Sequence, residues 1–400
     1  MSQALFRVDR PVRVAILAAV AYALFIVARI EIAGHGQVGA LILLSRHFVN
    51  ASKLPVTVPI RSDNGYDGQF FFRMALDPFS LALTKYGITL DSFFRLERIG
   101  YPLLAWVFAL GKARLVPYSL VFVNWISMVA MTFFAARLAT DNGHHAVWGL
   151  VPALYPGYLF SVGRDTAEPV AAAAMIAGIY FFSHGRPWAA AVLLAFAGLA
   201  RETTLAVSLS MGLVWLWRVL RVRISARQGA NLGLRALFVA GGLPAVVYGL
   251  WQVVIRTHFH GTAIAFDASH NLSVPFVAML GAIGSHVVLL TQVHQVAPLA
   301  ADALWVVQLG LMLVLAGWAL WALNKSSAPA YLKIALLLLV VVTVSLSNAT
   351  WPNASYFRSL DLLLVFSWLV LVYGRKRWNL WIGAAALFWL AVALELVVAL

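Results

Sequence analysis

The feature that most constrains this chain is a series of apolar runs, about 20 residues long, that recurs from one end to the other. A helix needs about 20 consecutive apolar residues to cross the hydrocarbon core of a bilayer. Charged residues occupy only 11% of the 400 positions, against about 25% in soluble domains, so the chain lacks the polar side chains to cover a water-facing surface. The sequence therefore predicts an all-α fold, a single polytopic transmembrane helical bundle over residues 1–400.

The apolar runs also define a topology of about 11 spans. We predict these spans near residues 12–33, 116–138, 146–162, 167–183, 187–200, 203–221, 233–256, 303–323, 331–347, 357–373 and 378–399. The first run follows Arg7, Arg10 and Arg13 without a convincing small-residue cleavage site after it, so we predict a retained first helix with a cytoplasmic N-terminus. The chain has no cysteine, which excludes disulfides, thiolate metal sites and cysteine nucleophiles.

The distribution of basic residues sets the predicted orientation. The net charge is +14, and the arginines between 218 and 227, Lys325 and the run 375–377 all fall in loops on the N-terminal side. The positive-inside rule expects this excess in cytoplasmic loops, so the charge does not call for a nucleic-acid partner. The agreement requires that segment 274–291 does not cross the membrane, and we predict that it is re-entrant or interfacial within an outer loop over 257–302.

A long polar stretch follows the first predicted span. Residues 34–98 carry acids and bases interleaved with aromatics such as Phe70, Phe71 and Phe72. This mixture favours a folded loop on the membrane surface over a disordered linker. Segment 101–112 is apolar but too short to cross, so the sequence predicts a first outer loop over 34–112 that carries interfacial helices.

Charged residues at the ends of the apolar runs gather on the outer face of this topology. They come from five separate segments and comprise Asp63, Asp67, Glu97, Arg98, Arg164, Asp165, Glu168, Arg201, Glu202, Arg358 and Asp361. Such groups are expensive to place in lipid, and together they offer a carboxylate base with guanidinium clamps for an anionic head group. The alternatives are that they only cap helix ends and pair with one another, or that Asp67, between Gly65 and Gly68, only forms a turn.

Other sequence patterns are weaker. His258 and His260 form an HxH, with His270, His286 and His294 nearby, but their spacing matches no zinc pattern, and interfacial histidines are the simpler interpretation. The chain has no phosphate-binding glycine loop, no dinucleotide fingerprint and no GxSxG turn. We therefore predict no metal ligands and no cofactor, while a divalent metal stays open.

Five short stretches of the chain resemble the GT-C superfamily of membrane glycosyltransferases, which use polyprenyl-phosphate-linked sugars. GYDGQFFFRMALDP (65–78) is similar to the acidic first-loop motif of bacterial members, and ERIGYPLLAW (97–106) to the segment that follows it. RDTAEPVAAA (164–173), LARETT (199–204) and YFRSLDLLL (356–364) resemble later turns of the family. The loop lacks a paired Asp-Asp or Asp-Glu, which is a departure from the family pattern.

The resemblance implies a site on the outer face of a multi-pass protein of the bacterial inner membrane, acting in cell-envelope glycan biosynthesis. Asp67 would be the general base of an inverting transfer, with Asp63 as its competitor. The implied substrate-binding residues are Tyr66, Gln69, Glu97, Arg98, Arg164, Glu168, Arg201, Glu202 and Arg358. The implied partners are a polyprenyl-phosphate sugar donor, a glycan, lipid or protein acceptor, and membrane lipids.

Two other readings of the same features stay open. A transporter or flippase of a lipid-linked or anionic substrate would also have many spans and intramembrane charges, although transporters more often place those charges near the midplane, between paired halves. A non-catalytic scaffold of a cell-envelope complex would tolerate replacement of Asp67 and the outer arginines. The long first loop and the one-sided charges favour the enzyme.

Overall fold

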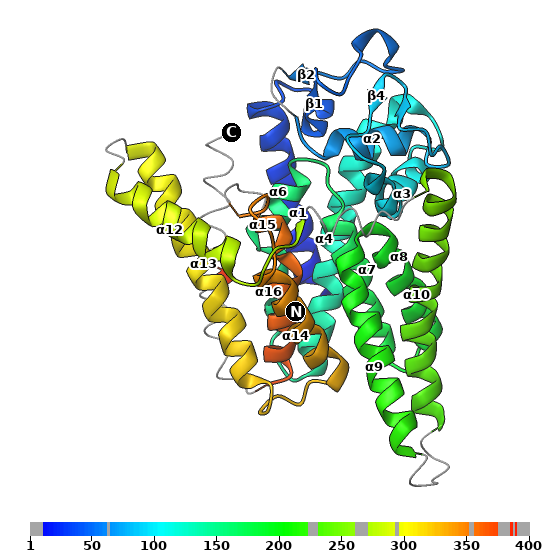
Figure 1. The fold of residues 1–400 in the computed structure, drawn as a ribbon, viewed down its shortest axis with the longest axis vertical. Helices are drawn as coiled ribbons and strands as arrows, with labels where there is room; N and C mark the ends of the chain where they lie inside the picture. Colours follow the sequence, from blue (N-terminus) through cyan, green and yellow to red (C-terminus); the bar gives the residue numbers. More distant parts are fainter. Residues whose placement is uncertain are drawn as a thin grey trace, which may run out of the picture.

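The computed structural model describes residues 11–61, 65–222, 231–260, 271–292, 296–351, 356–374, 385–386 and 389. Asp63 and most of the predicted span 378–399 lie outside these residues. The prediction of an all-α fold is confirmed in its coarse form, because helices dominate the described residues and each of the four strands has only two residues. Figure 1 shows long helices side by side, with the elements of the first loop gathered over one end of the bundle.

The bundle is built from helices of different lengths. They are α1 (Pro11–Ile32), α4 (Val116–Asp141), α5 (Leu150–Ala153), α6 (Pro156–Val162), α7 (Glu168–Ser183), α8 (Pro187–Ala200), α9 (Leu205–Val222), α10 (Asn231–Phe259), α12 (Val277–Gln292), α13 (Val296–Ala322), α14 (Ala330–Val344), α15 (Tyr356–Ser359) and α16 (Asp361–Val372). The single turns η4 (Ala113–Leu115), η5 (Ala146–Gly149) and η6 (Glu202–Thr204) precede α4, α5 and α9.

Five of the described helical segments are long and apolar enough to cross a membrane. They are Pro11–Ile32, Ala113–Asp141, Glu202–Arg221, Gly233–Phe259 and Trp305–Ala322. Their outward faces carry large apolar side chains, such as Leu24 on α1 and Leu250 on α10, which are 66% and 63% exposed. Exposed apolar surface of this kind suits contact with lipid rather than water. Five further apolar helices are shorter, so the count of 11 spans stays a prediction.

The centre of the bundle is α16, whose residues from Asp361 to Val372 are all buried. A helix that is apolar all round lies either inside the protein or against lipid, and the burial of every residue places α16 inside the protein. It packs against α13 and α14, while α4 packs against α1 and α7. This core holds the short helix α15, which carries Arg358, in a fixed position at one end of α16.

The stretch between α1 and α4 contains short, well-defined elements. They are η1 (Val38–Ile42), β1 (Leu44–Ser45), η2 (Ala51–Lys53), β2 (Ile60–Arg61), α2 (Gly68–Leu76), β3 (Thr84–Lys85), β4 (Ile88–Thr89), η3 (Phe93–Arg98) and α3 (Gly100–Phe108). Strand β1 pairs with β2 in parallel, and β3 pairs with β4 antiparallel. Every residue of α2 is buried, so this loop has an apolar core of its own.

The structure differs from the predicted segment boundaries most clearly at two places. The predicted span 146–162 is divided into η5, α5 and α6, because Tyr155 precedes Pro156 and adopts an extended backbone that interrupts the helix. The predicted outer loop 257–302 contains the helix α12 and the first residues of α13, which begins at Val296. Periodicity alone does not locate these ends, since apolar side chains continue through both regions.

Candidate functional site

Asp67 lies at the centre of a group of ion pairs at the loop end of the bundle. It precedes α2, but its side chain makes no hydrogen bond to the start of that helix. Its Oδ1 lies 3.0 Å from a guanidinium nitrogen of Arg95, and its Oδ2 lies 2.7 Å from one of Arg358. The carboxylate therefore does not serve as a helix cap; it joins the first loop to the far end of the chain.

Two glycines allow Asp67 to reach this position. Gly65 has a φ of 66°, which a side chain would disfavour, so it makes the turn that the sequence predicts. Gly68 has a different role, because a Cβ at this residue would lie only 2.4 Å from the carbonyl oxygen of Arg164. The first loop thus passes directly against the turn between α6 and α7.

Glu168, the first residue of α7, is the second acid of the site and is 2% exposed. Its Oε1 lies 3.1 Å from Nε of Arg358 and also pairs with Arg201. Its Oε2 accepts a hydrogen bond of 3.3 Å from the hydroxyl of Ser161. Arg358 consequently bridges two acids, Asp67 and Glu168, that come from different elements.

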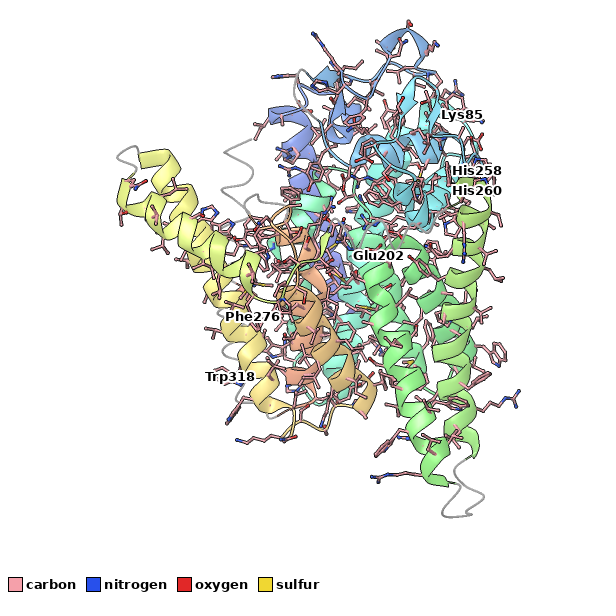
Figure 2. All side chains as sticks on the ribbon, viewed as in Figure 1. Lys85, Glu202, His258, His260, Phe276 and Trp318 are labelled. Carbon is pink, nitrogen blue, oxygen red and sulfur yellow. The ribbon has the colours of Figure 1, made fainter. Side chains whose placement is uncertain are left out.

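A second group of charges adjoins the first at the end of η3. Arg98 donates two parallel hydrogen bonds of 2.9 Å to the carboxylate of Glu202, a bidentate geometry that holds both planar groups in one orientation. Figure 2 shows Glu202 at the end of α9 that faces the first loop. Neighbouring Glu97 is fully buried and accepts a hydrogen bond of 3.0 Å from the Tyr248 hydroxyl of α10.

The charges at Asp67 favour its ionised form. Burial raises the pKa of this carboxyl, but the positive charges of Arg95 and Arg358 outweigh burial and hold the pKa well below its usual range. The result is an anion enclosed by cations from separate elements. A phosphate group is also an anion with several acceptor oxygens, and it could accept hydrogen bonds from the same guanidinium donors.

Aromatic rings form one wall of this site. The guanidinium of Arg358 lies 5.2 Å from the ring centre of Tyr66, and that of Arg164 lies 3.6 Å from the ring centre of Phe160. Tyr66 and Phe160 themselves meet edge to face at 5.4 Å. Cations over ring faces are held in place without losing their positive charge.

Asp165 is a further acid of the α6–α7 turn, and its environment is different. It is fully buried at a φ of 47°, and neither carboxylate oxygen has a hydrogen-bond partner among the described residues. Burial raises the pKa of Asp165 well above its usual range, which favours the protonated acid. Two neighbouring turns thus hold one acid that favours its ionised form, Asp67, and one that favours its neutral form.

An apolar groove begins beside the charges and follows α9 and α10. Its volume is about 500 Å³, and its wall is almost entirely apolar. Leu205, the first residue after η6, lines the groove at the end next to Glu202. Tyr248 also lines it and, through its hydroxyl, contacts Glu97 of the charged group. Polar and apolar surfaces therefore meet at this point.

Most of the predicted site residues come together in the structure. Asp67, Glu168, Arg201 and Arg358 form one network, Glu97, Arg98 and Glu202 form the adjoining one, and Tyr66 and Arg164 form the aromatic wall. Gln69 lies elsewhere: its side-chain oxygen accepts the Ser45 backbone N–H at 3.1 Å and ties α2 to β1. Asp63 lies outside the described residues.

Two residues of the site were not predicted. Arg95 binds Asp67, and its spacing of three residues before Arg98 is the only signal that could have placed it on the same side of a helical turn. Tyr248 lies in the middle of an apolar helix, where nothing in its sequence context separates it from an interfacial aromatic.

The surroundings of Asp67 do not suit a metal cation. Both carboxylate oxygens already lie within 3.0 Å of guanidinium nitrogens, whose positive charge would repel a divalent ion. Within the described ranges, no three His, Cys, Asp or Glu side chains gather closely enough to hold a metal. His258 packs edge to face on Phe259, and His270 and His294 lie outside the described residues.

Comparison with known proteins gives no relative for this chain: no protein-family model, no curated protein and no solved structure matches it. Its function therefore has to be inferred from the chemistry of the site rather than from descent. That chemistry consists of an ionised carboxylate, several oriented guanidinium groups and an adjoining apolar groove.

Proposed function

We propose that this protein is a multi-pass membrane glycosyltransferase. It moves a sugar from a polyprenyl-phosphate donor to an acceptor hydroxyl on the outer face of the membrane, with its N-terminus in the cytoplasm. The observation that carries the proposal is the convergence of Asp67 and Glu168 with Arg95, Arg201 and Arg358 beside an apolar groove. A lipid-linked phosphosugar needs both surfaces, one for its phosphate and one for its tail.

The proposed reaction is a direct displacement at the anomeric carbon of the sugar. The acceptor oxygen forms a bond to this carbon while the bond from the carbon to the phosphate oxygen breaks, which inverts the configuration. Asp67 takes the proton of the acceptor hydroxyl, and polyprenyl phosphate leaves with the bonding electron pair. The negative charge that develops on the phosphate is stabilised by the arginines.

The ion pairs of Asp67 explain how substrate binding can activate this base. A carboxylate held by Arg95 and Arg358 is a weak proton acceptor, because both cations favour its ionised form. The donor phosphate competes for the same guanidinium groups. A bound phosphate neutralises part of their positive charge, so the carboxylate regains basicity only in the complex with the donor.

The groove between α9 and α10 supplies the place for the polyprenyl tail. It is apolar, and its lining reaches from Leu205 beside the charges to Leu216, farther along α9. Gly242 lines it and has open space around the position of a Cβ, so the side chain of Gly242→Leu starts in open space and would narrow the groove. This variant should raise the KM for the donor, while Gly310→Leu, outside the groove and equally unhindered, should not.

The central test measures sugar transfer by the purified protein in liposomes. Radiolabelled sugars linked to undecaprenyl phosphate serve as donors and a cell-envelope fraction as acceptor. Asp67→Asn should lower transfer by at least about a hundredfold, because it removes the general base. Asp77→Asn is the matched control, since Asp77 is an acid of the same loop that pairs with Lys85 away from the site. Undiminished transfer by Asp67→Asn would remove Asp67 from the mechanism.

A transporter or flippase of the same lipid-linked or anionic substrate is the competing proposal, since an anion-binding site beside an apolar groove would also suit it. The two proposals differ in the fate of the sugar–phosphate bond. Movement of intact donor between the leaflets of a liposome, without transfer to any acceptor, would favour the transporter. A scaffold role would instead leave both measurements unaffected by Asp67→Asn.

A further inference from the structure

A second cavity lies between α9, α10 and α14, toward the end of α9 and α10 that is farther from the charged site, and it shares Leu213 and Leu216 with the first groove. Its volume is about 870 Å³. Leu213, Leu216 and Leu220 of α9 and Ile334 of α14 give it an apolar wall. Two basic residues, Arg218 and Arg221, also line the cavity, and they lie on the last turns of α9. In Figure 1 this end of the two helices is the one farthest from the first loop.

The two arginines have no acidic partner in the part of the chain that the structure describes. Both side chains are exposed. The guanidinium of Arg221 lies 4.4 Å from the ring centre of Trp217, another residue of the cavity wall. Arg218 reaches across to α10, where its Nη1 lies 3.8 Å from the position of a Cβ on Gly233. Both positive charges are thereby held at the rim of an apolar cavity.

The start of α10 adds to this positive potential. The helix is 29 residues long and begins at Asn231, so Arg218 lies beside its first turn. The first N–H groups of a helix have no partner within it and carry the positive end of its dipole, which favours an anion. The two guanidinium groups therefore lie at the rim of the apolar cavity, and one of them, Arg218, lies beside the first turn of α10.

From these contacts we infer that the cavity, which we call the α9–α14 groove, binds an anionic glycerophospholipid. The phosphate of its head group pairs with Arg218 and Arg221, and its acyl chains fill the apolar space between α9 and α14. Basic residues next to apolar clefts at a membrane surface are the chemistry that selects anionic lipids over zwitterionic ones. The inference requires that these helices lie in a membrane, but it does not depend on sugar transfer.

The expected selectivity follows from the two charges. A basic residue near the surface favours an anionic lipid by a factor of about five, so two of them favour it by about 30-fold over a zwitterionic lipid with the same acyl chains. Both arginines can be replaced without loss of packing, because their side chains are exposed. The double variant Arg218→Gln/Arg221→Gln should therefore fold and lose the selectivity.

The test is native mass spectrometry of the full-length protein in a nonionic detergent, titrated with phosphatidylglycerol or phosphatidylcholine of identical chains. The wild type should bind phosphatidylglycerol about 30-fold more tightly, and the double variant should bind the two lipids equally. Arg186→Gln/Lys325→Gln is the matched control, since these are exposed basic residues outside the groove, and it should keep the preference.

Three results would overturn the inference. They are equal binding of the two lipids by the wild type, an undiminished preference in the double variant, and displacement of bound lipid by millimolar glycerol 3-phosphate, which would indicate a site for free phosphate. Sugar transfer, measured on the same double variant, separates this inference from the proposed function. Loss of lipid selectivity with transfer intact would confirm two independent sites.

Discussion

Replacement of Arg358 by glutamine probes the contact that joins the two ends of the chain. Arg358 lies 2.7 Å from Asp67 and 3.1 Å from Glu168, so its removal leaves each acid with one remaining arginine, Arg95 or Arg201. The double-mutant cycle of Arg358→Gln with Asp67→Asn isolates the Asp67–Arg358 interaction from the others.

The structure sets the size of this interaction. Two unit charges about 4 Å apart attract by about 4 kcal/mol at an effective dielectric constant near 20, and breaking a buried pair costs about 3–5 kcal/mol. The side chains of Asp67 and Arg358 are only 16% and 11% exposed, so water screens them little, but Arg95 still neutralises part of the charge. We expect a coupling of about 2–4 kcal/mol.

The pH dependence of the coupling has a definite sign. The pKa of Asp67 in the folded protein lies below its value in the unfolded chain, so ion pairing stabilises the fold at all pH values above the unfolded pKa of about 4. Stability is lost as the pH falls from there through the folded pKa. The coupling should therefore be constant between pH 5 and 8 and should decline below about pH 4.

The assay is reversible unfolding in mixed micelles of a mild detergent and dodecyl sulfate, followed by circular dichroism. The wild type, both single variants and the double variant are compared at pH 7 and at pH 3.5, with exposed Arg186→Gln as a control. A coupling below about 0.5 kcal/mol at pH 7, or one that grows at pH 3.5, would refute the ion-pair reasoning.

Three further variants test the surroundings of the site by thermal unfolding. Gly68→Ala places a Cβ 2.4 Å from the Arg164 carbonyl oxygen, so it should destabilise the fold by about 1–3 kcal/mol and lower sugar transfer. An unchanged Tm would contradict this close packing. Arg98→Gln leaves Glu202, whose side chain is only 11% exposed, without its bidentate partner and should cost about 3 kcal/mol. Asp165→Asn should stabilise the protein at pH 8 more than at pH 4. The folded pKa of Asp165 is raised, so the wild-type protein loses stability as the pH rises toward that pKa, and the neutral amide of the variant does not have this loss. A stabilisation by Asp165→Asn that is the same at both pH values would contradict this.

The chemistry of the site was only partly readable from the sequence. Charged residues at the ends of apolar runs, such as Glu168 and Arg358, were recognisable because lipid penalises them wherever they have no function or partner. Their partners were not recognisable. Gln69 belongs to the same motif as Asp67, yet it ties the backbone of β1 to α2, while Arg95, which was not among the predicted site residues, binds Asp67.

Asp67 and Asp165 show the same limit for two residues of one type. Each precedes a helix in a turn, and each was a plausible ionised acid from the sequence. The structure surrounds Asp67 with guanidinium groups and buries Asp165 without a hydrogen-bond partner among the described residues, so their pKa values shift in opposite directions. The shift depends on neighbours that come from other segments.

The sequence by itself determined that this chain folds as apolar helices with a polar loop after the first, because hydrophobicity over about 20 residues is a local property. It also determined which charged residues needed an explanation. Only the tertiary structure decided that α16 lies at the centre, that Arg358 bridges Asp67 and Glu168, and that an apolar groove adjoins them. Those contacts join residues from distant parts of the chain, and the packing of the helices between them fixes their distances.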